Sequence, residues 1–193
     1  MTMANASTTG FGFKPVKMAG QSANTAGLGE YSVAANATAI YNQDLVDMQA
    51  GGTAAVSAAG DQQILGSLNG VFYTDASTSK PTFQAYLLAN NTATDIVALV
   101  NDDPHQMYEV RSNNAGASAQ GDVGSTAEIS YSAGASPNYI SRSTLDDATL
   151  GTGSQQLKIV GVSRDPDNND LASAGVVWRV VISEHFFKQH TGV

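Results

Sequence analysis

Few residues in this sequence have the types and spacing that chemistry requires. The three histidines are His105, which follows Asp102-Asp103-Pro104 in an expected turn, His185, which follows a strongly apolar segment, and His190. His185 and His190 lie five positions apart, a spacing that fits one face of neither a helix nor a strand. The chain has no cysteine, which excludes disulfides, a thiolate nucleophile and cysteine metal sites. We therefore expect no metal centre.

Acidic residues form two patterns that could serve a site. The loop Asp165-Pro166-Asp167-Asn168-Asn169-Asp170 has the alternating oxygen donors of a calcium loop. An EF-hand is excluded, because Asp170 replaces its glycine and Val176 its bidentate glutamate. A polar turn is favoured, and a cation site of another kind stays open. The adjacent pairs Asp102/Asp103 and Asp146/Asp147 would point to opposite faces of a strand, which favours turn or cap roles over acid–base catalysis.

One nucleophile pattern is present. Ser77-Thr78-Ser79-Lys80 has a Ser-x-x-Lys spacing. Pro81 follows at once and argues against a catalytic helix there, and the companion Ser-Asp-Asn and Lys-Thr-Gly motifs are missing. The sequence also lacks a phosphate-binding Gly-x-x-x-x-Gly-Lys loop, a Gly-x-Ser-x-Gly motif and a basic-aromatic patch. We expect a protein that is not an enzyme and needs no cofactor.

Composition narrows the class of partner. The 193 residues carry 17 acidic and 9 basic side chains, a formal charge of −8, with a pI of about 4.5. This balance argues against direct nucleic-acid binding and against an anionic membrane surface. Charged residues make up only 13%, so small neutral polar side chains must cover the surface, as is common on extracellular or virion proteins and less common on cytosolic enzymes. Without a signal-peptide pattern or an apolar run of about 20 residues, we expect synthesis in the cytoplasm.

The first thirty residues read as an extended N-terminal arm, and residues 31–193 as a single β-rich domain. The segment Gly10–Met18 has too few apolar residues to form a core alone, so it must lie on another surface. That surface is either its own domain or a neighbouring subunit. The candidate partner-binding residues are Phe11, Phe13, Pro15, Val16 and Met18.

Beyond the arm, short apolar runs alternate with turn residues and no long amphipathic helix is evident. This pattern predicts an all-β fold, a barrel or sandwich of short antiparallel strands. Asn69-Gly70 predicts a hairpin turn between strands at 64–65 and 71–73. Residues 82–88 favour a strand over a helix. The remaining expected strands span residues 31–33, 39–41, 45–48, 54–56, 94–100, 106–111, 128–131, 157–163 and 176–183.

Two further segments have weaker signals. Around Ser143, capping-box-like spacings predict either a short helix that Gly151 ends or an ordinary loop. The stretch Asn113–Gly124, rich in Gly, Ala and Ser, predicts a surface loop because it can bury little apolar area.

Three segments together resemble structural proteins of tailed bacteriophage virions, especially marine ones. They are Ile40–Val46 with the following Ile64–Gly66 and Gly70–Tyr73, then Val100–Arg111, and finally the C-terminal third with Leu157–Val162, Asp167-Asn168 and Val180–Phe186. One departure is Gln43, where such proteins tend to have glycine before the aspartate.

The resemblance implies a β-barrel virion component, most like a capsid decoration (cement) protein. Such proteins are non-enzymatic, present in many copies and often trimeric. Its partners would be the major capsid protein and copies of itself on the outer surface of the capsid. One alternative is a tail-tube, neck or fibre component. A second is a module that binds glycans or a host surface, with Trp178 as the stacking candidate, although its place between Val177 and Val180 favours a core or interface position.

Overall fold

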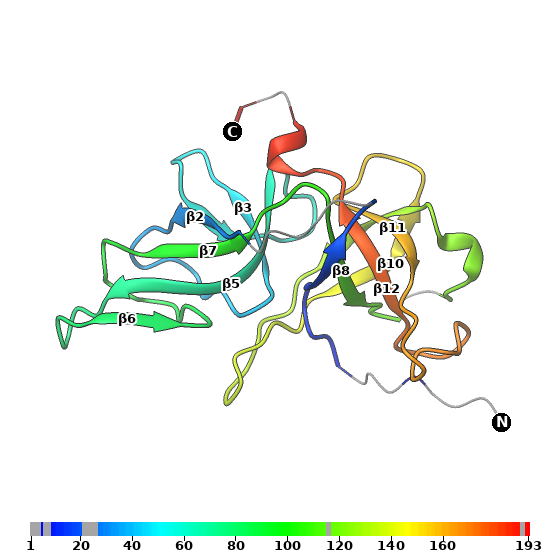
Figure 1. Cartoon of the computed structure of the whole chain (residues 1–193), viewed down its shortest axis with the longest axis horizontal. Coiled ribbons are helices and arrows are strands. Elements are labelled where there is room, and N and C mark those ends of the chain that lie inside the picture. Colours follow the sequence, from blue (N-terminus) through cyan, green and yellow to red (C-terminus); the bar gives the residue numbers. More distant parts are fainter. Residues whose placement is uncertain (1–4, 6–8, 21–26, 115–116, 190–191) are drawn as a thin grey trace.

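The structure is a computed structural model that describes residues 5, 9–20, 27–114, 117–189 and 192–193. Its regular elements are β-strands in two antiparallel six-stranded sheets, side by side in Figure 1. The all-β class is confirmed. Within the described ranges neither sheet closes into a barrel, so the arrangement fits a sandwich and the barrel implied by the resemblance is not found. None of these residues forms a helix long and apolar enough to span a membrane.

Sheet A has the strand order β1-β8-β12-β11-β9-β10. Its strands are β1 (Lys14–Met18), β8 (Gln106–Arg111), β9 (Thr126–Ser130), β10 (Thr144–Gly151), β11 (Leu157–Val162) and β12 (Val177–Ile182). Two 3₁₀ turns, η1 (Gln120–Asp122) and η2 (Phe186–Lys188), flank these strands.

Sheet B has the order β2-β7-β5-β3-β4, and β6 also pairs with β5. Its strands are β2 (Gly29–Ser32), β3 (Leu45–Met48), β4 (Ala54–Val56), β5 (Ile64–Thr74), β6 (Pro81–Gln84) and β7 (Val97–Asn101). The long strand β5 is central, because β7 lies on one side of it while β3 and β6 follow one another on the other.

The topology is nested, which corrects the expected boundary at residue 30. Strand β1 belongs to sheet A, yet the next six strands form sheet B before the chain returns as β8. There Lys14 pairs with Glu109 and Met18 with Gln106. Strand β2 begins at Gly29 within sheet B. Residues 14–18 and 29–30 are therefore built into the sheets and do not form a separate arm; residues 21–26 lie outside the described ranges.

Each sheet buries its own apolar cluster, and the clusters interlock. Leu45 and Ile64 come from sheet B but pack in the cluster of sheet A, whereas Phe186, which follows β12, packs against the cluster of sheet B. The buried Gln156 also crosses between the sheets. Its amide donates to the carbonyls of Ala58 (2.7 Å) and Asp61 (2.8 Å). These links fix the two sheets relative to one another.

Two sequence predictions fail because pairing overrides a local signal. Asn69-Gly70 does not turn the chain, and β5 runs straight through it with a register shift between Leu68 and Gly70. The extra residue, Asn69, is a bulge in β5 opposite β7, so β5 continues through this position and no hairpin forms. The segment after Ser143 is neither helix nor loop but β10, because Leu145 pairs with Ile129 across the sheet.

Candidate partner-binding surface

The structure corrects the assignment of Phe13 and Met18 as partner-binding residues. Phe13 is 0% exposed and Met18 is 7% exposed, and Phe13 lies in the core of sheet A. The amide of Phe13 donates to the Gln43 carbonyl at 2.9 Å. Gly12 has a φ of +74°, and a Cβ there would lie 2.4 Å from the Gln43 oxygen, so only glycine lets the chain pass this close. Of the two alternatives for this segment, it docks on its own domain.

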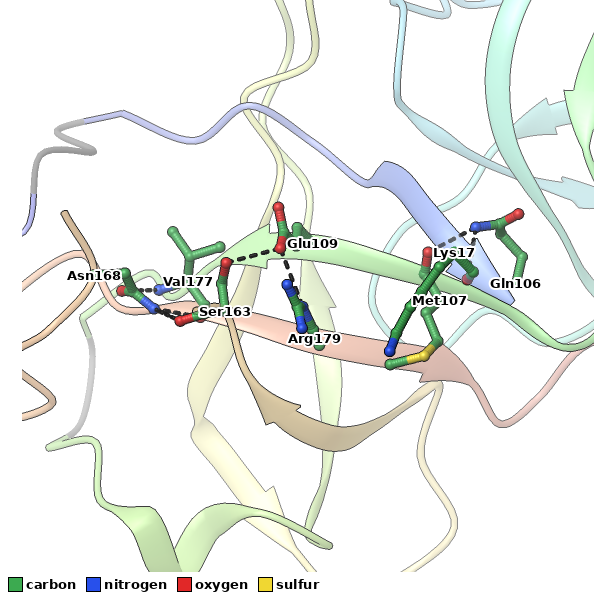
Figure 2. Close-up of polar contacts among 8 residues, drawn as sticks. All are labelled: Lys17, Gln106, Met107, Glu109, Ser163, Asn168, Val177 and Arg179. Carbon is green, nitrogen blue, oxygen red and sulfur yellow. Dashed lines mark hydrogen bonds and ion pairs between the residues drawn. The ribbon is translucent and has the colours of Figure 1, made fainter. Parts of the chain in front are cut away.

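Strand β1 is also tied to β8 through side chains. The Gln106 amide donates to the carbonyl of Lys17 (3.1 Å) on β1 and to that of Met107 (2.8 Å) on β8 (Figure 2). The outer edge of β1 carries exposed Lys14 and Lys17 together with Pro15. Lysines and proline are the residues that protect an edge strand from pairing with another chain. This edge is therefore a poor acceptor for an added strand.

The other three candidates keep part of their surface. Phe11, Pro15 and Val16 are half-buried. Phe11 lines an open pocket of about 370 Å³ whose wall also includes Lys14 and Glu109. Partner contact by these three residues stays a prediction.

The acidic loop at Asp165–Asp170 borders the same pocket and is a polar turn. Its anchor is Asn168, whose side chain donates to the carbonyls of Ser163 (3.0 Å) and Val177 (2.9 Å) and accepts from the Val177 amide (2.9 Å), as Figure 2 shows. Beside it, Glu109 accepts from Ser163 Oγ (2.7 Å) and Arg179 Nε (3.2 Å). In the part of the chain that the structure describes, no group of three or more His, Asp or Glu side chains converges as a metal site.

The other chemical candidates have structural roles. Asp75 Oδ1 accepts from the amides and hydroxyls of Ser77 and Thr78, so the Ser-x-x-Lys segment is the turn between β5 and β6. His105 sits in an exposed turn. His185 is fully buried. His190 lies outside the described residues.

The structure corrects the assignment of Asp146 and Asp147 and confirms the position favoured for Trp178. Asp146 and Asp147 were expected in a turn or cap, but both lie on β10, where the buried Asp147 accepts a hydrogen bond from Ser112 Oγ. Trp178 is 0% exposed in the core of sheet A. It cannot stack on a glycan, which confirms the core position that its apolar neighbours favour.

A pair of exposed phenylalanines lies on the outer face of sheet B. In the register of the sheet, Phe72 on β5 lies opposite Phe83 on β6 and Val97 on β7, and all three side chains share one face. Phe72 is 46% exposed and Phe83 is 58% exposed. Leu99, half-buried, is two residues from Val97 and points the same way. We call these four residues the Phe72–Phe83 face.

The Phe72–Phe83 face points outward because the other face of β5 and β7 is buried. Val71, Tyr73, Ala98 and Val100 alternate along β5 and β7 with Phe72, Val97 and Leu99 and are buried in the core of sheet B. The Phe83 ring also lies over Gly70, because a Cβ there would approach its Cζ to 2.7 Å. Covering a glycine is a structural role for Phe83, yet more than half of its surface remains accessible.

Sequence reasoning did not identify this face. Alternation in the expected strand at 71–73 could have placed Phe72 opposite in direction to Val71 and Tyr73. The partner Phe83 could not be found this way, because only the pairing of β6 with β5 brings it beside Phe72.

Comparison with protein families, curated proteins and solved structures finds no match to this chain. A function must therefore be argued from its own residues and geometry.

Proposed function

We propose that this chain is a non-enzymatic structural protein of a tailed-bacteriophage virion, a capsid decoration (cement) protein that binds and stabilises the head shell. Its partners are the major capsid protein and further copies of the chain, arranged as a trimer on the outer surface of the capsid. The Phe72–Phe83 face is the observation that carries the binding role. The similarity of three sequence segments to virion proteins supports the choice of partner.

The size of the apolar face suits a modest contact made many times. A phenylalanine side chain buries on the order of 200 Å² when fully covered, and about half of each ring is exposed here. Covering both rings removes roughly 200 Å² from water, worth at most about 5 kcal/mol before the cost of ordering is subtracted. This energy gives only weak binding for one isolated subunit, but the overall affinity rises steeply where several linked copies bind the same shell.

The face is also rigid before it binds. Phe72, Val97 and Leu99 lie on β5 and β7, whose opposite side packs into the core of sheet B, and Phe83 lies on β6, which is paired with β5. A preformed surface loses little conformational freedom on association. The free edge of β6 is only four residues long and begins with Pro81, which has no N–H. Binding through the face, not by strand addition, follows from this.

The experiment is the rebinding of the protein to purified head particles from which it has been removed. The double variant Phe72→Ser/Phe83→Ser should lose at least about 30-fold in affinity, since it forfeits most of the apolar contact. Particles reconstituted with it should rupture at the lower temperature of undecorated shells. The matched control is Val160→Ser/Phe187→Ser, which changes two exposed apolar residues outside the face and should rebind like the wild type.

Unchanged rebinding by Phe72→Ser/Phe83→Ser, with its fold intact by circular dichroism, would contradict the assignment of the face. The copy number per particle distinguishes the alternatives. Copies on the order of hundreds indicate the shell, whereas about six or twelve indicate the tail or neck. Binding on a glycan array would instead favour the host-surface module.

A further inference from the structure

Negative charge is concentrated in the part of the chain that forms sheet B. Between residues 29 and 101 there are six carboxylates and a single basic residue, Lys80, a net charge of 1 − 6 = −5. The rest of the chain has eleven acidic and eight basic residues, so it contributes −3 to the total of −8. Sheet B is thus both the more acidic part of the chain and the part with the exposed aromatic pair.

The exposed carboxylates lie at opposite ends of the Phe72–Phe83 face. Glu30 on β2 is exposed and pairs with Leu99, so its side chain is on the same face as that leucine. At the far end, Asp95 accepts from the Thr74 amide (3.1 Å) and Asp75 begins the β5–β6 turn. Hydrogen bonds from Ser77 and Thr78 lower the pKa of Asp75 to about 2, and those from Thr74 lower the pKa of Asp95. Both carboxylates are therefore charged at neutral pH.

We propose that the Phe72–Phe83 face binds a protein surface whose apolar centre is ringed by lysine and arginine side chains. The inference rests on the proposed function and adds the chemistry of the partner. The apolar centre of the face would exclude water, while Glu30, Asp75 and Asp95 form a polar rim that a basic ring complements. A second copy of this chain does not fit here, because it would bring two parts of charge −5 together. Copies in a trimer meet through other surfaces.

Charges at the rim of an interface act in a characteristic way. They accelerate the encounter with an oppositely charged partner and are screened by salt, whereas apolar contact is not weakened in this way. Neutralising the rim should therefore weaken binding at low salt and leave binding at high salt nearly unchanged. Removing the phenylalanines should weaken binding at both.

The test uses the stripped head particles as the probe and compares rebinding at about 0.01 M and about 1 M salt, over which the screening length falls from about 30 Å to about 3 Å. The rim variant is Glu30→Gln/Asp95→Asn, which keeps an oxygen to accept from Thr74. The control is Asp165→Asn/Asp167→Asn, which removes the same charge beside sheet A. We expect the rim variant to bind about fivefold more weakly at low salt and equally at high salt, and the control to match the wild type.

The outcomes separate the two proposals. If the phenylalanine double variant fails to bind but the rim variant matches the wild type at low salt, the basic partner surface is wrong and the proposed function stands. An equal loss in the control also overturns the inference, since the effect would then be one of net charge alone. A self-associated wild type that becomes monomeric in Phe72→Ser/Phe83→Ser would show a second copy on this face. If the phenylalanine variant binds normally, the Phe72–Phe83 face is not the binding surface and this inference fails; if the wild type itself does not rebind to the particles, the proposed function fails.

Discussion

Replacing His185 with asparagine tests how the segment after β12 is held on sheet B. His185 is 0% exposed and forms a parallel bridge with Ile64 at the start of β5. Its Nδ1 accepts a hydrogen bond from the Phe187 amide at 3.2 Å, so the ring must be neutral, because a protonated Nδ1 could not accept. Burial, and then the nearby Lys188, lower the pKa of His185 to about 4, against weaker opposing effects of Asp102 and Asp103.

The magnitude follows from linkage. The folded pKa of about 4 lies below the ordinary value of 6.5. The stabilising contribution of the neutral ring is therefore fully present above pH 6.5 and is lost as the pH falls through 4. Each unit of pKa difference is worth about 1.36 kcal/mol. Between pH 7 and pH 4 the wild type should lose at most about 3 kcal/mol through this residue.

The assay is urea unfolding followed by the fluorescence of Trp178, the single tryptophan, whose complete burial makes its emission sensitive to unfolding. Dilute protein is needed because the pI of about 4.5 lies within the pH range. Asparagine can still accept from Phe187 but does not titrate. The variant loses the packing of the imidazole ring, which lowers its stability equally at every pH. The difference in free energy of unfolding between the wild type and His185→Asn should therefore shrink by about 3 kcal/mol from pH 7 to pH 4.

Exposed His105 provides the control for replacing a histidine, and His105→Asn should lose less than about 0.5 kcal/mol of stability at pH 7. A difference in free energy of unfolding between the wild type and His185→Asn that stays constant to within about 0.5 kcal/mol would refute the reasoning. A protein with a buried neutral histidine must become less stable on acidification.

Three further predictions concern stability. Burial raises the pKa of Asp44 from 3.8 to about 6, so its ionisation destabilises the fold as the pH rises through 6. Asp44→Asn should therefore be about 2 kcal/mol more stable than the wild type at pH 7 and no more stable at pH 4. Urea unfolding at the two pH values measures the difference. Phe13→Ala should cost about 4 kcal/mol and Phe11→Ala less than about 1 kcal/mol, a difference of about 10 °C in thermal midpoint; equal midpoints would contradict the burial of Phe13. Gly66 has a φ of +153°, and a Cβ there would lie 1.9 Å from the backbone oxygen of Asn101. Gly66→Ala should therefore lower the free energy of unfolding by more than about 3 kcal/mol. A variant with wild-type circular dichroism and an unchanged urea midpoint would disprove the close approach.

Much of the strand pattern was predictable because period-two alternation and turn residues are local signals. Residues 45–48, 54–56 and 106–111 were expected as strands with the bounds observed. Residues 82–88 were only partly right, since β6 ends at Gln84 and Leu87 forms a single bridge with Ile40. Residues 39–41, expected as a strand, contribute only that bridge.

The features that were missed depend on contacts between distant residues. Nothing near Phe13 in the sequence indicates that this side chain packs in a core formed mainly by strands that come more than ninety positions later, beginning with β8. The Phe72–Phe83 face likewise exists only because β6 folds back on β5. The conformation of Gln43 is also not visible in the sequence, because its φ of +67° is a left-handed conformation that glycine adopts more readily than glutamine.

The nesting of sheet B between β1 and β8 sets an order of events during synthesis. Met18 leaves the ribosome 106 − 18 = 88 residues before its partner Gln106, a delay of roughly 4 to 18 s at ordinary elongation rates. In that interval every strand of sheet B has emerged, while Phe13 and Met18 have no cavity to enter. During this delay, Lys14, Pro15 and Lys17 should oppose the pairing of this segment with strand edges of other nascent chains.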